Sequence, residues 1–126
     1  LHRVDRRQRQ MCIRDSYASY LQAMVPFARF EMAAGDDQER LRVGREAHAQ
    51  LTGFIRHYPE SAYRSEIVPR LETLLEGMAG SEYALAMQDV ERGQRERGEA
   101  RLRYLAKYYP RSKAAVEAQA WLQTGN

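Results

Sequence analysis

Apolar residues recur along most of this chain at intervals of three and four, which is the spacing of one face of an α-helix. The pattern predicts helices over residues 17–33, 36–58, 62–92, 95–109 and 112–122. Pro69, Gly77 and Gly80 interrupt the third segment, so it forms either one long bent helix or two helices that meet near 77–81. No segment alternates apolar and polar residues with the period of two that a strand requires. The sequence therefore predicts an all-α protein.

The tetrapeptide Tyr-Pro-x-Ser occurs twice, as Tyr58-Pro59-Glu60-Ser61 and as Tyr109-Pro110-Arg111-Ser112. A large apolar residue, Phe54 or Leu105, precedes each tyrosine by four positions and is expected in the core. Proline cannot extend a helix, because it lacks an N–H and clashes with the preceding turn, and serine is a favoured N-terminal cap. Each copy therefore ends one helix and begins the next. Repeated units of this kind predict a tetratricopeptide-like helical-hairpin solenoid, an architecture typical of protein-binding scaffolds.

The periodicity also predicts which side chains face the core. In the first helix, the expected buried face consists of Tyr17, Tyr20, Leu21, Met24, Phe27 and Ala28. The next helix is expected to begin with a capping box made by Asp36 and Glu39. Gly44 weakens its first half, because glycine is a poor helix former.

The net charge of +3 comes from the N-terminal segment. Residues 1–16 hold five arginines and two aspartates, whereas residues 17–126 hold fifteen basic and fifteen acidic residues. The segment lacks the apolar stretch of a signal peptide, and Cys12 lacks the small and apolar residues that precede a lipoprotein acceptor cysteine. Its string RRQRQMCIRDS resembles translated sequencing-adapter read-through; the alternative is a native basic arm. We expect residues 1–16 to be a non-native or disordered extension and 17–126 to be a partial helical repeat domain.

Motifs that would carry chemistry are weak. Gly93-x-x-x-x-Gly98 has the spacing of a phosphate-binding loop, but Glu99-Ala100 follows where Lys-Ser/Thr is required. The charges in the run 91–101 alternate, and Glu91–Arg95, Arg95–Glu99 and Glu99–Arg103 lie four positions apart, which favours ion pairs on a helix. No histidine has a second histidine or a cysteine three or four positions away. We expect no enzyme, cofactor, metal or nucleic-acid partner; a nucleic-acid binder using the basic arm and an enzyme with a dispersed site are the alternatives from other classes.

Residues 36–122 resemble the BamD family, the helical-repeat lipoproteins of the bacterial outer-membrane β-barrel assembly machinery. The resemblance rests on F-I-x-x-Y-P-x-S-x-Y at 54–63, on Ala86 followed by Glu91-Arg92-Gly93, and on Arg101 followed by Tyr109-Pro110, in ungapped order. The family's lipidated cysteine and its last repeat have no counterpart. We therefore expect a fragment of the middle and later repeats.

This resemblance implies a non-enzymatic scaffold in the periplasm, attached to the inner face of the outer membrane. It implies that the partners are the periplasmic domains of BamA and unfolded outer-membrane protein precursors, and that membrane attachment needs a lipid anchor absent from this chain. An arginine matching Arg101 lies at the family's BamA contact, so Arg101 is the candidate partner-binding residue, expected on an exposed face. The alternative for Arg101 is an intrahelical ion pair. The alternative function is another tetratricopeptide interaction module of the cell envelope, of the Tol–Pal-linked type.

Overall fold

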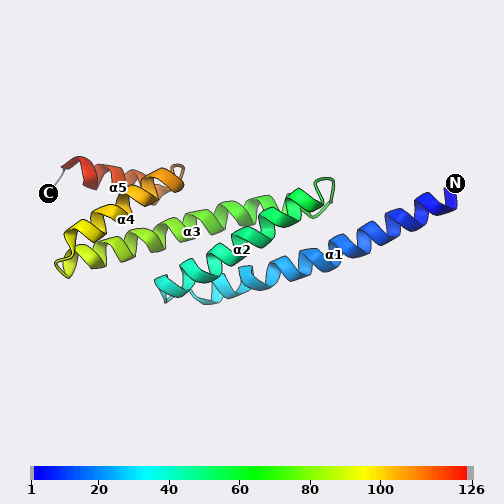
Figure 1. Ribbon diagram of the computed structural model, residues 1–126, viewed down its shortest axis with the longest axis horizontal. Helices are drawn as coiled ribbons and strands as arrows, with labels where there is room; N and C mark the ends of the chain where they lie inside the picture. Colours follow the sequence, from blue (N-terminus) through cyan, green and yellow to red (C-terminus); the bar gives the residue numbers. More distant parts are fainter. Residues whose placement is uncertain (1, 125–126) are drawn as a thin grey trace.

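The computed structural model describes the backbone of residues 2–124 and the side chains of residues 15–124. Over this range the chain forms helices joined by short turns (Figure 1). They are α1 (His2–Met32), α2 (Asp37–His57), α3 (Arg64–Glu91), α4 (Arg95–Tyr108) and α5 (Lys113–Thr124). No strand is present within residues 2–124. The all-α prediction is confirmed, and α3 is one continuous helix despite Pro69, Gly77 and Gly80.

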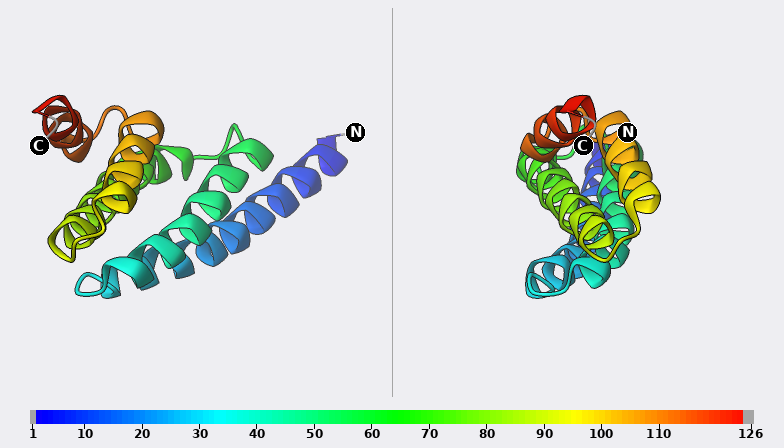
Figure 2. Two further views of the ribbon diagram at one scale, coloured as in Figure 1. Left: turned by 60° about the vertical axis from the view of Figure 1, so that its left-hand side comes forward. Right: turned by 90° about the vertical axis from the view of Figure 1, so that its left-hand side faces the viewer.

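The helices pack as successive antiparallel hairpins. Helix α1 pairs with α2 and helix α3 pairs with α4, while α2 packs on α3 and α5 packs on both α3 and α4. The start of α1 and the end of α5 lie at opposite ends of the long axis, so the hairpins follow one another along it (Figures 1 and 2). This stacking confirms the predicted tetratricopeptide-like architecture.

The two Tyr-Pro-x-Ser turns have nearly the same backbone geometry. Tyr58 and Tyr109 both have φ of −127°, with ψ of 64° and 52°. Each tyrosine N–H closes the last turn of its helix by donating to the carbonyl four residues earlier, at 2.8 and 2.9 Å. Each tyrosine carbonyl accepts the N–H of the serine that follows, at 3.1 Å in both copies. The predicted helix ends at both tyrosines are confirmed.

The hydroxyls of the two serines in these turns form different hydrogen bonds. Ser112 Oγ accepts the N–H of Ala115 at 3.0 Å and caps α5 as predicted. Ser61 Oγ instead accepts the N–H of Tyr63 at 3.2 Å and lies 3.3 Å from Ser16 Oγ of α1. The prediction that Ser61 caps the next helix is wrong, because the chain makes a further turn before α3 begins. That hydroxyl joins the turn to α1.

Helix α1 differs from its prediction in extent and in orientation. It begins at His2 rather than near Tyr17, and continues through Pro26. Its buried side chains include Ala23, Phe27 and Phe30, whereas Tyr17 and Leu21 are about half exposed, at 49% and 47%. This stretch is apolar on more than one side, so periodicity alone could not select the face that meets α2. Whether residues 1–16 are native stays a prediction.

Two glycines make room for one aromatic ring where three helices meet. A Cβ on Gly77 of α3 would lie 2.6 Å from Phe30 Cζ, and one on Gly44 of α2 would lie 3.3 Å from Phe30 Cδ2. The Arg40 guanidinium carbon lies 4.4 Å from the centroid of the same ring. The glycines that weaken the helical pattern therefore allow Phe30 of α1 to pack fully buried against α2 and α3.

The core consists of two clusters along the solenoid. One is formed by apolar residues of α1, α2 and α3, and the other by residues of α3, α4 and α5. Tyr109, in the second Tyr-Pro-x-Ser turn, packs against both clusters. Phe54 and Leu105 are buried, at 4% and 0% exposure, as predicted from their place before each tyrosine.

Candidate partner-binding site on helix α4

Helix α4 begins directly after the turn that ends α3. Gly93 has a φ of 82°, in the left-handed region that glycine adopts without strain, and this residue reverses the chain. Gly98 then lets α4 approach α3 closely, because a Cβ there would lie 2.7 Å from the Ala86 carbonyl oxygen. Leu102 and Leu105 complete the buried face of the helix. This close approach brings the polar flanks of α4 within reach of α3 side chains.

Arg101 forms ion pairs across the α3–α4 hairpin. Its Nη1 donates to Glu82 Oε1 at 2.7 Å, and its Nε lies 3.3 Å from Asp89 Oδ2. The side chain of Glu82 is 5% exposed and that of Arg101 is 27% exposed. Arg97 Nε also lies 3.7 Å from Asp89 Oδ2. The expectation of an exposed Arg101 is therefore wrong, and so is the alternative of an intrahelical pair; its role in partner binding stays a prediction.

The buried Glu82 carboxylate needs an opposite charge beside it, which explains the position of Arg101. A buried charge is costly to desolvate, and the cost is offset only by a well-placed opposite charge. Arg101 is the described side chain that pairs with Glu82. Two carboxylates therefore fix the guanidinium in one orientation, with about a quarter of the side chain left open to solvent. Arg101 is both a connector of two helices and a preoriented cation at the surface.

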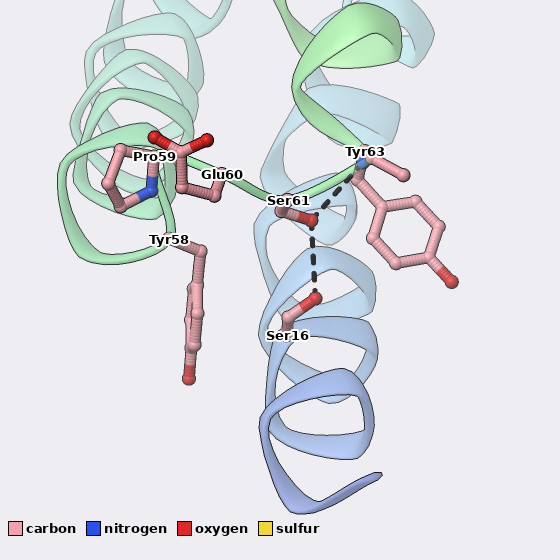
Figure 3. Close-up of a pocket in the computed structure, with 7 residues that line it drawn as sticks. Ser16, Tyr58, Pro59, Glu60, Ser61 and Tyr63 are labelled. Atoms are coloured by element: carbon pink, nitrogen blue, oxygen red, sulfur yellow. Dashed lines mark hydrogen bonds between the residues drawn. The ribbon is translucent and has the colours of Figure 1, made fainter. Parts of the chain in front are cut away.

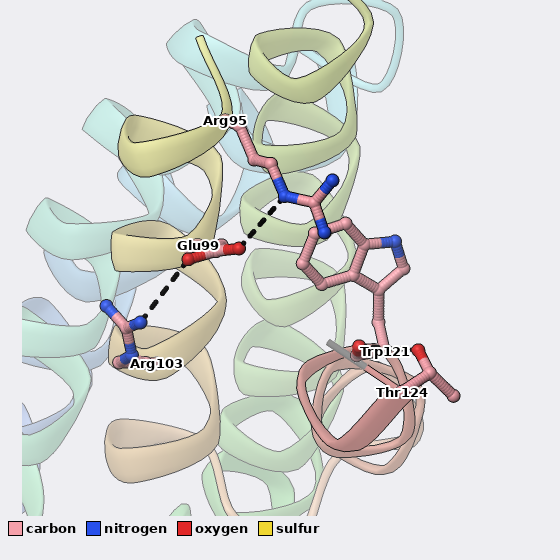
Figure 4. A network of polar contacts seen from close by, with 5 residues as sticks. All are labelled: Arg95, Glu99, Arg103, Trp121 and Thr124. Atoms are coloured by element: carbon pink, nitrogen blue, oxygen red, sulfur yellow. Dashed lines mark hydrogen bonds and ion pairs between the residues drawn. The ribbon is translucent and has the colours of Figure 1, made fainter. Parts of the chain in front are cut away.

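The opposite flank of α4 is occupied by a chain of ion pairs. Arg95 Nε lies 3.2 Å from Glu99 Oε1, and Arg103 Nη2 lies 3.4 Å from Glu99 Oε2 (Figure 4). The Arg95 guanidinium also lies over the ring of Trp121 in α5, 5.3 Å from its centroid. The predicted pairs Arg95–Glu99 and Glu99–Arg103 are confirmed. This flank binds α4 to α5 and gives a structural account of the charged run in 91–101.

A groove opens beside each Tyr-Pro-x-Ser turn. The first has a volume of about 520 Å³, and in it the Ser61 hydroxyl stands between Ser16 and the Tyr63 N–H, with the rings of Tyr58 and Tyr63 on either side (Figure 3). The second, of about 530 Å³, lies between the 109–112 turn and α3, where its lining includes Leu75. The first lining is largely aromatic and apolar, whereas the second combines apolar and aromatic residues with Glu72, Glu76 and Arg111.

The surroundings of Tyr20 and Tyr109 do not favour acid–base chemistry at their hydroxyls. The hydrogen bond that Tyr20 donates to Glu66 raises the pKa of the Tyr20 hydroxyl, and burial raises the pKa of Tyr109. Both shifts move the hydroxyl further from ionisation at neutral pH, so neither group is tuned as a general base. In residues 15–124, no three His, Cys, Asp or Glu side chains gather as metal ligands would. The absence of an enzyme activity and of a cofactor stays a prediction.

Comparison with known protein families identifies one that matches this chain. The family model YfiO, described as an outer membrane lipoprotein, matches residues 12–126, which include both Tyr-Pro-x-Ser turns and Arg101. The chain belongs to the YfiO family. This is the BamD family of the sequence resemblance, and its description associates its members with the cell envelope. No curated protein matches the chain. None of the described helices is long and apolar enough to cross a membrane.

Proposed function

We propose that this protein is a non-enzymatic scaffold of the outer-membrane β-barrel assembly machinery, acting in the periplasm at the inner face of the outer membrane. Membership of the YfiO family over residues 12–126 is the observation that carries the proposal. The stacked hairpins support it, because solenoids of this kind present extended surfaces for binding other proteins. In this proposal, a lipid anchor attaches the protein to the membrane.

The proposed partners are the periplasmic domains of BamA and unfolded outer-membrane protein precursors. Arg101 supports the first of these. Glu82 and Asp89 already hold its guanidinium in place, so little side-chain entropy remains to be lost on binding. With Nη1 and Nε already directed at Glu82 and Asp89, the remaining N–H groups of the guanidinium can donate to a carboxylate on the partner. The groove at the first Tyr-Pro-x-Ser turn supports the second, because it offers apolar space to an extended chain.

Calorimetric titration of the 126-residue chain with the periplasmic domains of the cognate BamA tests the proposal. The informative variant combines Arg101→Met with Glu82→Gln, which removes both charges of the pair and leaves no buried carboxylate unpaired. We expect it to bind at least about tenfold more weakly, as for loss of a charge at a packed interface. Arg103→Met, on the opposite flank of α4 with its side chain 66% exposed, is the matched control and should bind like the parent.

Circular dichroism of each variant separates a loss of binding from a loss of fold. A folded parent chain that does not bind the BamA domains would count against the proposal and favour another cell-envelope repeat protein. Equal affinity of the parent and the double variant would remove Arg101 from the contact while leaving the scaffold role intact.

A further inference from the structure

Helix α4 covers only about half of helix α3. Helix α3 has 28 residues and α4 has 14, and α4 ends at Tyr108, which lines the second groove together with Leu75 of α3. Residues 64–75 of α3 therefore extend beyond the end of α4. Their buried side chains, Ile67 and Leu74, pack in the core cluster shared with α1 and α2. The opposite side, which we call the exposed α3 face, carries Ser65, Val68, Pro69 and Glu72.

The two grooves lie at the two ends of the exposed α3 face. Helices α2 and α4 run in the same direction, so both Tyr-Pro-x-Ser turns lie at the same edge of the solenoid (Figure 1). The lining of the first groove ends at Tyr63, one residue before α3, and that of the second includes Glu72 and Leu75. Leu75 follows Tyr63 by twelve positions, which corresponds to about 18 Å along a helix. An extended chain rises about 3.3 Å per residue, so about five or six residues cover this distance.

The first groove suits a large apolar side chain. The rings of Tyr58 and Tyr63 stand on its two sides (Figure 3). The Tyr63 ring stacks on that of Tyr20, with centroids 4.4 Å apart, and the Tyr58 hydroxyl accepts a hydrogen bond from Ser19 Oγ at 3.4 Å. Contacts within the protein therefore hold both rings in place, which lowers the entropy cost of binding a side chain between them.

The polar groups beyond the first groove match a polypeptide backbone. Pro69 has no N–H, so the carbonyl of Ser65 lacks the donor that an α-helix supplies from four residues further on. In the second groove, Glu72 offers a carboxylate and Arg111 a guanidinium, and neither forms an ion pair within residues 15–124. An extended backbone carries N–H donors and C=O acceptors along its length. The carbonyl and the carboxylate can accept from its N–H groups, and the guanidinium can donate to its carbonyls.

We propose that one extended polypeptide segment binds across both grooves. A large apolar side chain fills the first groove, and the segment then crosses the exposed α3 face, where the Ser65 carbonyl accepts one of its N–H groups. Its backbone pairs with Glu72 and Arg111 in the second groove. This inference rests on the proposed function and deepens it, because it gives the binding of unfolded precursors a minimum length. A bound segment needs an apolar residue and about five or six further residues on one side of it.

Fluorescence anisotropy with end-labelled peptides tests this length requirement. Each peptide has a central leucine with either two or seven alternating serine and threonine residues on both sides, so that one long flank can reach the second groove whichever way the chain runs. We expect the long peptide to bind the 126-residue chain at least about tenfold more tightly than the short one, because the second groove adds an intramolecular contact. A long peptide with serine in place of the central leucine should lose this advantage. Equal dissociation constants for the two lengths contradict the inference.

Two variants of the protein test the grooves one at a time. Ala62→Arg places a long side chain in the first groove and should weaken the binding of both peptides at least about tenfold. Glu72→Ala/Arg111→Ala removes the polar groups of the second groove, so it should reduce the affinity for the long peptide to that for the short one and leave the short one unaffected. Circular dichroism checks that each variant is folded. The matched controls at exposed positions of α2, which should bind like the parent, are Ala49→Arg and Glu46→Ala/Arg56→Ala.

The outcomes separate this inference from the proposed function. If Glu72→Ala/Arg111→Ala binds the long peptide as the parent does, the inference is overturned, whatever the BamA domains do. If the BamA domains fail to bind while the peptides show the expected effects of length and substitution, the proposed function is overturned and the two grooves remain a site for an extended chain. A parent chain that binds the BamA domains but not the long peptide keeps its proposed scaffold role and loses this site.

Discussion

Reversal of the charge at Arg101 should destabilise the fold, in contrast to what an exposed helical arginine would do. The substitution Arg101→Glu removes the donor that lies 2.7 Å from Glu82 Oε1 and places a third carboxylate beside Glu82 and Asp89. The Glu82 side chain, 5% exposed, cannot compensate by turning to water. The new glutamate side chain must either turn away from α3 or lie beside the carboxylates of Glu82 and Asp89. Both outcomes favour the unfolded chain.

The size of the effect follows from the burial of the two partners. Breaking a buried ion pair by removing one member costs about 3–5 kcal/mol, whereas a fully exposed pair contributes about 0–1 kcal/mol. Because Arg101 keeps 27% of its side chain exposed, we expect a loss between these limits, about 2–4 kcal/mol. Native domains have a stability of only about 5–15 kcal/mol, so this is a large fraction of the total.

Urea unfolding followed by far-ultraviolet circular dichroism measures the loss as a shift of the midpoint. Arg103→Glu is the control, because Arg103 is on the same helix with its side chain 66% exposed, and it should cost no more than about 1 kcal/mol. Adding Glu82→Lys to Arg101→Glu restores an opposite pair and should recover part of the loss. If Arg101→Glu and Arg103→Glu unfold at the same urea concentration, the interhelical pair does not stabilise the protein and the reasoning fails.

Two further substitutions test the packing. Gly98→Ala should destabilise the protein by about 1–3 kcal/mol, because the new Cβ would meet the backbone oxygen of Ala86. Gly80→Ala is the control and should stabilise the protein by up to about 1 kcal/mol, because nothing lies within 4 Å of its Cβ position. Equal unfolding midpoints of the two variants would contradict the close approach of α4 to α3. Phe54→Ala and Leu105→Ala should each cost about 2–5 kcal/mol in the same assay, and a midpoint unchanged from the parent would mean that the residue is not in the core.

The helix pattern and the turns were predictable because their causes are local. Pro59 and Pro110 each follow a tyrosine that completes the apolar face of its helix, so the ends at Tyr58 and Tyr109 followed from a few neighbouring residues. Pro26 and Pro69, in contrast, lie inside helices. The role of Ser61 did not follow, because it depends on Ser16 of a distant helix. The buried face of α1 was also out of reach, since a stretch that is apolar on several sides does not specify which side a neighbour covers.

The partners of Arg101 were not predicted, because they lie on α3 and the expected alternative was an ion pair within α4. A signal was present in the sequence. Gly93 marks the reversal between two helices, and Asp89 and Arg97 lie equally far from it on either side. Glu82 lies two turns before Asp89 on the same face of α3, and Arg101 follows Arg97 by one turn. Matching charged residues of the two helices in order of their distance from the turn would have predicted these ion pairs.

The Phe30 ring, seated against Gly44 and Gly77, has a consequence for the geometry of the whole scaffold. A ring wedged into a close-packed gap cannot slide without a clash, so the angle between the first and second hairpins is set by one side chain. Helices α1 and α4 belong to different hairpins, and that angle fixes their separation. The structure therefore predicts a constant distance between the first and second hairpins.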